Sequence, residues 1–481
     1  MALRDDIPAL VEHIKANQCI LDHNFKLFDI YEGNLLKYVE QDLARQLSPQ
    51  SFEQARHRIC LLNILRQLMD KLSRIYPPTR RVIDGADQDG ELLAWYEDTL
   101  NANQICNQAN EFFNLFKSSL LEPYIWNGRP YLRAIPSDRF LPYTADRVNP
   151  TVPTHFIIAM GDRRVEIANP RSGAIEYSVR TIYFAYTAQE WIVFDSDGMI
   201  RPEIMFEYGN PEGINPYGVL PFVYINRSRN LLIPKPDSDL YVMARLPSIL
   251  ATDQNFCAMF QSFSIVYGID VDDENVRMAP NAFWSFRSDP NSEKTPQVNV
   301  LKPEGDIDQL TRLIQNTLAM WAQTRGIKVN FAGNMNGQDI QSGVAKLIDE
   351  LDTWQDREKQ TAFFIDAEQQ LWNLILKDMH PVWQQAGMID TALPAFNPNA
   401  DIEVNFAEQI PLISRGDLVE DLQAEVAAGF ITRRRAIKKL NPRMSDEEID
   451  DLLAEMDEER APMLPPADDN MGDDDDGTRE D

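Results

Sequence analysis

The longest helical pattern in the chain runs from Val344 to Asp378 and reads VAKLIDELDTWQDREKQTAFFIDAEQQLWNLILKD. Its apolar residues recur at close to the 3.6-residue period of an α-helix, with the charged stretch Gln355–Gln360 between them. These apolar positions are Val344, Leu347, Ile348, Leu351, Trp354, Ile365, Leu371, Trp372 and Ile375. At 1.5 Å per residue such a helix would be about 50 Å long. That is more than a single compact domain usually needs.

Two shorter helical patterns precede the long one. They cover Asp239–Phe263, with Pro247 as an expected kink, and Asp306–Arg325. The insert between them holds four prolines and is too rich in proline to be helical. Because the insert is compact, the two helices can lie antiparallel. A loop rich in glycine and asparagine, Gly326–Gln341, then leads into the long helix.

The N-terminal part of the chain, to about residue 125, is also predicted to be helical. One helix is expected over Ser51–Ile75, with capping residues from Ser48 and a stop at Pro77-Pro78. A second helical region covers Gly90–Leu121. After Trp126 the pattern becomes β-rich up to about Asn226. Its expected strands include residues 131–135, 155–159, 178–186 and 190–194.

The C-terminal part alternates strand, helix and charged segments. A strand is expected at Ile402–Phe406, and helices at Asp417–Ala428 and Ser445–Glu459, the second opened by a capping box. The last twenty residues, Pro462–Asp481, are acidic and almost without apolar side chains. We expect this tail to be disordered.

The composition excludes several classes of protein. The chain has 481 residues, of which 44% are hydrophobic, so most of it is expected to fold. Its formal net charge of −29 excludes a nucleic-acid-binding surface over the whole molecule. No apolar stretch approaches the roughly 20 residues of a membrane-spanning helix, and the N-terminus shows no secretory signal. Synthesis in the cytosol would keep the cysteines as free thiols: Cys19, Cys60, Cys106 and Cys257.

Motifs typical of enzymes are missing from the sequence. It contains no phosphate-binding G-x-x-x-x-G-K-[ST], no G-x-G-x-x-G after a strand, no H-E-x-x-H and no G-x-S-x-G. We therefore expect a protein that is not an enzyme and that uses no cofactor and no metal. Two weaker alternatives are a zinc site and a hard-cation or two-metal site. The residues for the first are Cys19, His23, His57 and Cys60, and for the second Asp270, Asp272, Asp273 and Glu274, which a solvated loop explains better.

One concentrated basic patch lies between the two C-terminal helices. It consists of Arg433, Arg434, Arg435, Lys438 and Lys439. These side chains could contact DNA phosphates. They could equally be solvated or be paired with nearby acids such as Glu447 and Glu448, so both interpretations stay open.

The order of these parts resembles that of the tailed-bacteriophage portal proteins, the head-to-tail connectors. Short segments along most of the chain agree with this resemblance. They are Tyr31–Gly33, Ile75–Pro78, Asn215–Val223, Asp237–Leu240, Ser342–Ala345, Ile410-Pro411 and Gly429–Arg433. The helical region Gly90–Leu121 departs from the pattern, because it has no evident place in it.

The resemblance implies an α+β, portal-like fold with named regions. Residues 1–235 would form the wing, helical over 1–125 and β-rich over 126–235. The stem would comprise a helix at 236–267, a clip at 268–304 and a second helix at 305–325. A tunnel loop at 326–342 and a long tunnel helix returning to the wing at 343–400 would follow. The crown would cover 401–461, and the acidic tail 462–481.

The resemblance also implies function. Twelve copies would close into a ring at one capsid vertex, pass double-stranded DNA, and bind capsid and scaffold proteins, the terminase large subunit and later neck and tail adaptors. The particle would be assembled in the host cytoplasm, without a membrane. The tunnel-loop residues nearest to DNA would be Lys328, Asn330, Asn334 and Asn336, and subunit packing would use Leu347, Leu351 and Trp354. The alternatives are a metal-dependent hydrolase using Asp270, Asp272 and Asp273, or another head-tail adaptor of the virion.

Overall fold

Helices and antiparallel strands alternate along the chain, so the architecture is α+β, as predicted. The computed structural model describes residues 3–78, 80–84, 87–168, 175–262, 265–269, 297–301, 307–325, 343–390, 393–406, 415–440, 449 and 452–453. The chain forms two units, one made of Met1–Gln338 with Leu351–Gln409 and the other of Asp339–Glu350 with Ile410–Asp481. Among the helices described, none combines the length and apolar character that a bilayer crossing requires.

The N-terminal segment contains four helices, which are α1 (Leu3–Tyr31), α2 (Leu35–Gln46), α3 (Pro49–Arg56) and α4 (Ile64–Leu72). The Ser48 side chain caps α3 by accepting a hydrogen bond from the Ser51 amide at 3.3 Å. The single helix predicted over residues 51–75 is wrong, because the chain is irregular between α3 and α4. There the amides of Cys60 and Leu62 donate to side-chain hydroxyls of a distant helix rather than to their own carbonyls.

The next helices are α5 (Asp87–Leu100) and α6 (Ala102–Phe116). The expected continuation of helix to Leu121 is wrong, because Lys117 takes a left-handed conformation at φ 67° and ends α6. Ser118 then begins a strand, β2 (Ser118–Trp126). A further strand that the sequence did not reveal, β1 (Arg80–Asp84), pairs antiparallel with β11 (Asp401–Asn405). The strand expected near residues 402–406 is thereby confirmed.

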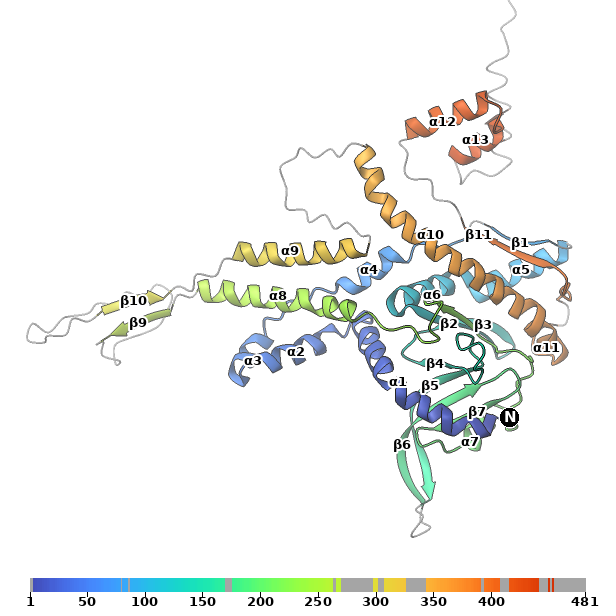
Figure 1. Ribbon diagram of the computed structural model, residues 1–481, viewed down its shortest axis with the longest axis horizontal. Helices are drawn as coiled ribbons and strands as arrows, with labels where there is room; N and C mark the ends of the chain where they lie inside the picture. Colours follow the sequence, from blue (N-terminus) through green and yellow to red (C-terminus); the bar gives the residue numbers. More distant parts are fainter. Residues whose placement is uncertain are drawn as a thin grey trace, which may run out of the picture. The chain divides into compact units, whose positions relative to one another are not determined.

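Two antiparallel sheets make up the β-rich region (Figure 1). The first has the order β3-β2-β8, with β3 at Arg129–Ile135 and β8 at Val223–Asn226. The second has the order β4-β5-β6-β7, and helix α7 (Pro202–Glu207) follows it. Its strands are β4 (Phe140–Tyr143), β5 (His155–Ala168), β6 (Ile175–Tyr186) and β7 (Trp191–Asp195). The four strand segments predicted between residues 131 and 194 are confirmed.

Helices α8 (Ser238–Ser262) and α9 (Ile307–Thr324) lie antiparallel (Figure 1). The Trp321 indole donates to Asp239 Oδ2 at 3.0 Å, and Gln254 Nε2 donates to Thr311 Oγ1 at 2.7 Å, so the start of each helix lies beside the end of the other. Between them, β9 (Ile265–Ile269) pairs antiparallel with β10 (Gln297–Leu301). The bounds of the two helices agree closely with the prediction, whereas the strand pair was not predicted.

The long helix is present as α10 (Gly343–Asn373), whose 31 residues correspond to about 46 Å at 1.5 Å per residue. It continues through a π-helical turn (Leu374–Met379) into α11 (His380–Gln385). The turn was not predicted, since its residues keep the apolar pattern of an α-helix. The C-terminal unit contains α12 (Arg415–Ala427) and α13 (Arg433–Leu440). Helix α13 was missed by sequence analysis, and the helix expected over Ser445–Glu459 lies outside the described residues except at three positions.

Three of the apolar cores determine how these helices and strands pack together. The largest core packs α10 and α11 against α5, α6 and strands β2, β3, β8 and β11. Trp372 and Trp383 are fully buried in it. A second core lies between the first half of α1 and the four-stranded sheet. A third joins the second half of α1 with α2, α4 and α6, and it includes Leu240 of α8 and Ala322 of α9. The helix pair is therefore anchored at one end by buried apolar contacts.

Candidate functional site

The predicted tunnel loop is bounded by elements that the structure describes. Lys328, Asn330, Asn334 and Asn336 lie outside the described residues. The loop leaves α9 after Arg325 and enters α10 at Gly343. The structure therefore shows which contacts hold the α9 end of this loop.

A cluster of charged side chains fixes that end. The Arg325 guanidinium donates from Nη2 to Asp239 Oδ2 at 2.9 Å and to Asp237 Oδ2 at 3.0 Å. It also lies over the Trp321 ring, 5.7 Å from the ring centre. The second carboxylate is shared, because Lys117 Nζ lies 2.5 Å from Asp237 Oδ1. This anchor cluster, Lys117, Asp237, Asp239, Trp321 and Arg325, ties the end of α6 and the start of α8 to the end of α9.

The anchor cluster keeps the Asp239 carboxylate ionised. Burial by itself would raise the pKa of Asp239, but hydrogen bonds from Arg325 and Trp321 outweigh it and lower the pKa. Asp239 also stands in the first turn of α8, where the helix dipole favours a negative charge. The ion pair with Arg325 therefore persists at neutral pH.

The predicted packing residues Leu347, Leu351 and Trp354 lie on the helical backbone of α10. Their spacing of four and three residues places them on one face of that helix. Their side chains lie outside the described part of the structure, so a role in subunit packing stays a prediction.

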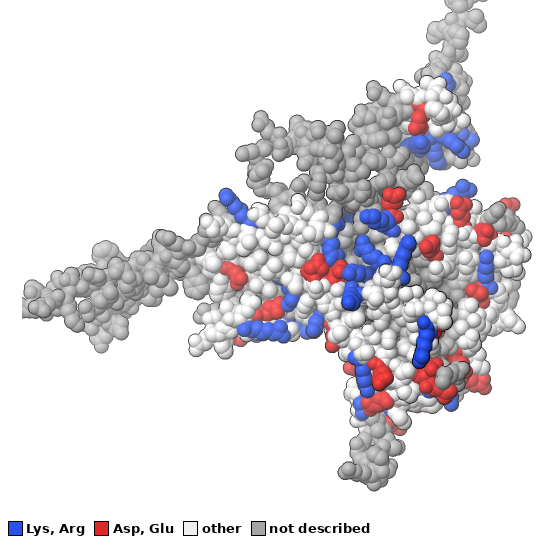
Figure 2. Space-filling view, in the orientation of Figure 1, with Lys and Arg blue, Asp and Glu red and all other residues white. Residues whose placement is uncertain are grey.

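The five cations of the basic patch are all on α13 and all exposed. The buried residue of this helix is Ala436, and helical spacing turns Arg434, Arg435 and Lys438 away from it. Lys439 Nζ lies 3.7 Å from Glu425 Oε2 of α12, a pair in which both side chains are well exposed. Figure 2 shows the Lys and Arg side chains gathered on this helix. Glu447 and Glu448, which the sequence offered as partners, lie outside the described residues.

The zinc alternative is contradicted by the structure. Cys19 is exposed on α1, and His57 is exposed at the C-terminal end of α3. His23 packs its ring against Tyr241 of α8, with ring centres 5.4 Å apart. Within the described ranges, no group of three or more His, Cys, Asp or Glu residues could hold a metal ion. The acidic group of the hydrolase alternative, Asp270, Asp272, Asp273 and Glu274, falls outside those ranges.

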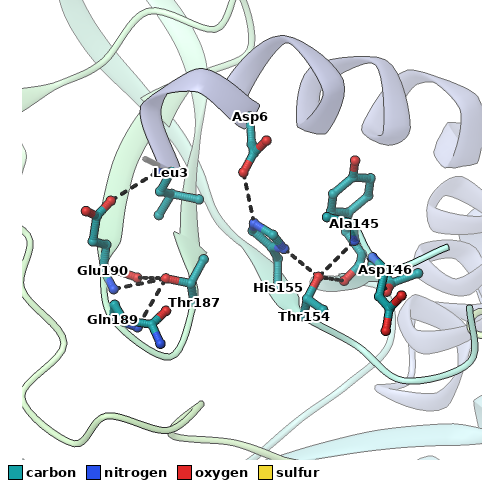
Figure 3. A network of polar contacts seen from close by, with 11 residues as sticks. Leu3, Asp6, Ala145, Asp146, Thr154, His155, Thr187, Gln189 and Glu190 are labelled. Carbon is teal, nitrogen blue, oxygen red and sulfur yellow. Dashed lines mark hydrogen bonds and ion pairs between the residues drawn. The ribbon is translucent and has the colours of Figure 1, made fainter. Parts of the chain in front are cut away.

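A Thr-His-Asp arrangement that sequence analysis missed joins α1 to the sheet (Figure 3). Thr154 Oγ1 lies 2.8 Å from His155 Nδ1, and His155 Nε2 lies 3.4 Å from Asp6 Oδ2. The order of the groups is that of a nucleophile, a base and an orienting acid. The threonine oxygen, however, accepts a hydrogen bond from the Ala145 amide at 2.9 Å and lies 3.4 Å from the Tyr143 carbonyl.

The electrostatics of this arrangement favour a structural role. Burial lowers the pKa of His155, and the charge of Asp6 only partly opposes that effect. A second contact also holds α1, because the Leu3 amide donates to Glu190 Oε2 at 3.0 Å (Figure 3). The two contacts pin the first turns of α1 to the β4–β7 sheet. No sequence signal could find them, because Asp6 and His155 are far apart in the chain.

No protein-family model matches the chain, and no curated protein matches it. The chain is similar to one in a solved structure described as "Neck of empty GTA particle computed with C6 symmetry". The identity is 11% and the TM-score 0.36, over 78% of this chain and 88% of that chain. Values this low do not establish a common fold.

Proposed function

We propose that the chain is a portal protein, which forms a ring-shaped channel at one capsid vertex for packaging and ejecting double-stranded DNA. The observation that carries the proposal is the order of elements over residues 238–373. An antiparallel helix pair encloses a two-stranded segment, and the 31-residue helix α10 follows after a loop. This order matches the stem, clip and tunnel helix that the sequence resemblance implies.

Ring formation has a physical basis in the helix pair. Helix α9 buries Leu318 and Ala322 within the subunit, whereas Leu313 and Met320 on the same helix are 50% and 62% exposed. On α8, Val242 is 47% exposed. A closed ring needs heterologous interfaces, in which one surface of each copy meets a different surface of the next. Apolar side chains on both helices suit such contacts, and we propose twelve copies.

Electrostatics support a channel that does not hold DNA tightly. The formal charge of −29 per copy repels phosphate, and screening limits this repulsion to about 8 to 10 Å at physiological salt. Only residues that face the bore would then matter. We propose that Lys328, Asn330, Asn334 and Asn336 of the loop after α9 come nearest to DNA, while the anchor cluster holds the α9 end of that loop in place.

The remaining assignments follow from the same proposal. Leu347, Leu351 and Trp354 would pack against a neighbouring copy, and the basic patch on α13 would contact DNA near the crown. The protein would act in the virion without catalysis. Energy for packaging would come from the terminase large subunit, and capsid, scaffold and later neck or tail adaptor proteins would bind other surfaces.

Electron microscopy of the purified full-length protein tests the proposal. The expected result is a ring with a central hole wide enough for duplex DNA. A strict monomer, even with capsid or scaffold protein present, would contradict it, as would a solid particle. Elemental analysis and a nuclease assay on the same sample would separate a portal from a metal-dependent hydrolase, since only the hydrolase should show bound metal and turnover.

A further inference from the structure

A buried hydrogen-bonded junction joins α4, α6 and α10. Asn114 of α6 donates from Nδ2 to Ser73 Oγ and to Gln360 Oε1, both at 3.1 Å. All three side chains are buried. Ser73 is the residue that ends α4, and Gln360 lies in α10, so the junction fixes the positions of three separate elements. The backbone next to these three residues is consequently held in a defined arrangement.

Four arginines surround this junction. Arg74 directly follows Ser73, and Arg357 precedes Gln360 by one helical turn. The other two follow β8, where their guanidinium groups lie over aromatic rings. Arg227 is 5.9 Å from the centre of the Phe113 ring, and Arg229 is 5.7 Å from that of Phe363.

The arginines form one connected surface. The Phe113 and Phe363 rings lie 5.5 Å apart, so Arg227 and Arg229 stand over neighbouring rings. Figure 2 shows Lys and Arg side chains gathered over the region where α4 and α10 come together. Arg74, Arg227, Arg229 and Arg357 are called the arginine cluster below.

The charge of three members of the cluster, Arg74, Arg229 and Arg357, is poorly compensated. In the part of the chain that the structure describes, no carboxylate oxygen lies within 4.0 Å of the guanidinium groups of Arg74, Arg229 or Arg357. Burial and the neighbouring positive charge of Arg74 both lower the pKa of Arg357. Other arginines of this acidic chain behave differently: Arg81, Arg133, Arg201 and Arg245 each contact a carboxylate.

We propose that the arginine cluster contacts the phosphate backbone of duplex DNA. A planar guanidinium matches the geometry of a phosphate, which it can bind with two parallel hydrogen bonds. Cation–π contact with the Phe113 and Phe363 rings restrains two of these groups, which lowers the entropy lost when they bind. Because Phe113 is fully buried under its arginine, it is not open to stacking with a base. Phosphate contacts carry no base information, so the proposed contact is independent of base sequence.

The proposal rests on the proposed function only in that a portal has DNA as its cargo. The competing anionic occupant is a flexible acidic peptide such as the segment Asp473–Asp476 of this chain. Duplex DNA is favoured as the occupant, since its regularly spaced phosphates can meet several neighbouring guanidinium groups at once. A flexible acidic peptide would lose conformational entropy on ordering over the same surface.

The test compares the salt dependence of DNA binding in two matched triple variants of the full-length chain. One carries Arg74→Gln, Arg229→Gln and Arg357→Gln. The control carries Arg4→Gln, Arg58→Gln and Arg147→Gln, which removes the same charge from exposed arginines elsewhere. The binding constant for a labelled duplex would be measured by fluorescence anisotropy between 50 and 200 mM salt.

Each phosphate contact contributes about 0.9 to the slope of the logarithm of the binding constant against the logarithm of salt concentration. Loss of three contacts should lower that slope by about 2.7, so that over this fourfold range wild-type affinity falls about 40-fold more than that of the cluster variant. The control should keep the wild-type slope. A third variant with lysine at positions 74, 229 and 357 keeps the positive charges and should retain most of the wild-type slope. This lysine variant is measured if the glutamine variant does not fold.

Equal slopes for the cluster variant and the control would overturn the proposal. So would a result in which removal of residues 462–481 raises DNA affinity while the arginine substitutions leave DNA binding unchanged. Electron microscopy of the same samples keeps the two hypotheses distinct. Rings with an unchanged slope would overturn the arginine cluster alone, whereas the absence of wild-type rings would overturn the portal.

Discussion

Arg81 and Glu368 form a bidentate ion pair between β1 and α10, with Nε to Oε2 at 2.6 Å and Nη2 to Oε1 at 2.7 Å. Their side chains are 4% and 0% exposed. The Trp372 indole donates to Glu368 Oε2 at 2.9 Å, and Arg81 Nη1 reaches Glu97 Oε1 at 3.0 Å. These hydrogen bonds satisfy charges that burial would otherwise destabilise. The second half of α10 is thereby fixed to β1 and α5.

Replacing Glu368 by alanine should strongly destabilise the fold. Arg81 would remain buried without its main partner, and breaking a buried pair in this way costs about 3 to 5 kcal/mol. Urea unfolding followed by circular dichroism would measure the change. Arg81→Met combined with Glu368→Met serves as the control, because removing both charges should cost less than removing one. A loss below about 1 kcal/mol in Glu368→Ala would show that the pair is not needed.

The contribution of Asp239 to stability should depend on pH. Its pKa in the folded protein is lowered from the ordinary value of 3.8. A lowered pKa means that the carboxylate stabilises the fold above the unfolded-state value and loses this effect as pH falls through the folded-state value. Asp239→Asn should therefore destabilise the protein at pH 7, by about 1 kcal/mol or less since the pair is partly exposed. The difference from wild type in urea unfolding should shrink at acid pH, and a constant difference would contradict the assignment.

The cysteines should differ widely in reactivity. Cys19 is exposed, whereas Cys106 is fully buried, and burial raises the pKa of the Cys106 thiol. Alkylation with iodoacetamide at pH 8, followed by mass spectrometry, should modify Cys19 rapidly and Cys106 only after denaturant is added. Rapid modification of Cys106 in the native protein would mean that the core around α6 opens readily.

A charge at position 354 should prevent ring closure. Trp354→Asp would place a carboxylate in a seam that we propose to be apolar, and burying an unpaired charge is strongly unfavourable. Size-exclusion chromatography and electron microscopy should show monomers or aggregates in place of rings. Glu358→Asp, at an exposed position of the same helix, is the control. Normal rings from Trp354→Asp would place that face in solvent.

Loss of the charge at Lys328 should alter DNA packaging or retention without affecting assembly. The loop that carries it is proposed to approach DNA, while the anchor cluster that holds its α9 end would be intact in Lys328→Ala. Rings should therefore form normally, as they should after deletion of Pro462–Asp481. A packaging assay with unchanged yield and retention would remove Lys328 from the proposed channel residues.

Much of the secondary structure could be predicted from the sequence because its signals are local. The period of apolar residues locates α8, α9 and α10 closely, and alternation with turn residues locates β5, β6 and β7. The order of these elements suggested the function. The sequence also located the basic patch, but it gave no sign of α13, on which that patch stands.

Only the tertiary structure decided which distant residues meet. Residues 57–63 follow a helical pattern, yet hydroxyls of Ser248 and Thr252, more than 180 positions away, take their backbone hydrogen bonds. The pairing of Arg81 with Glu368 and the arginine cluster around Asn114 likewise join segments more than 200 positions apart. The spacing of Cys19, His23, His57 and Cys60 suggested a site that does not form. Periodicity fixes which side of a helix is apolar, but the partner of that side is chosen by packing over the whole chain, and no local pattern records it.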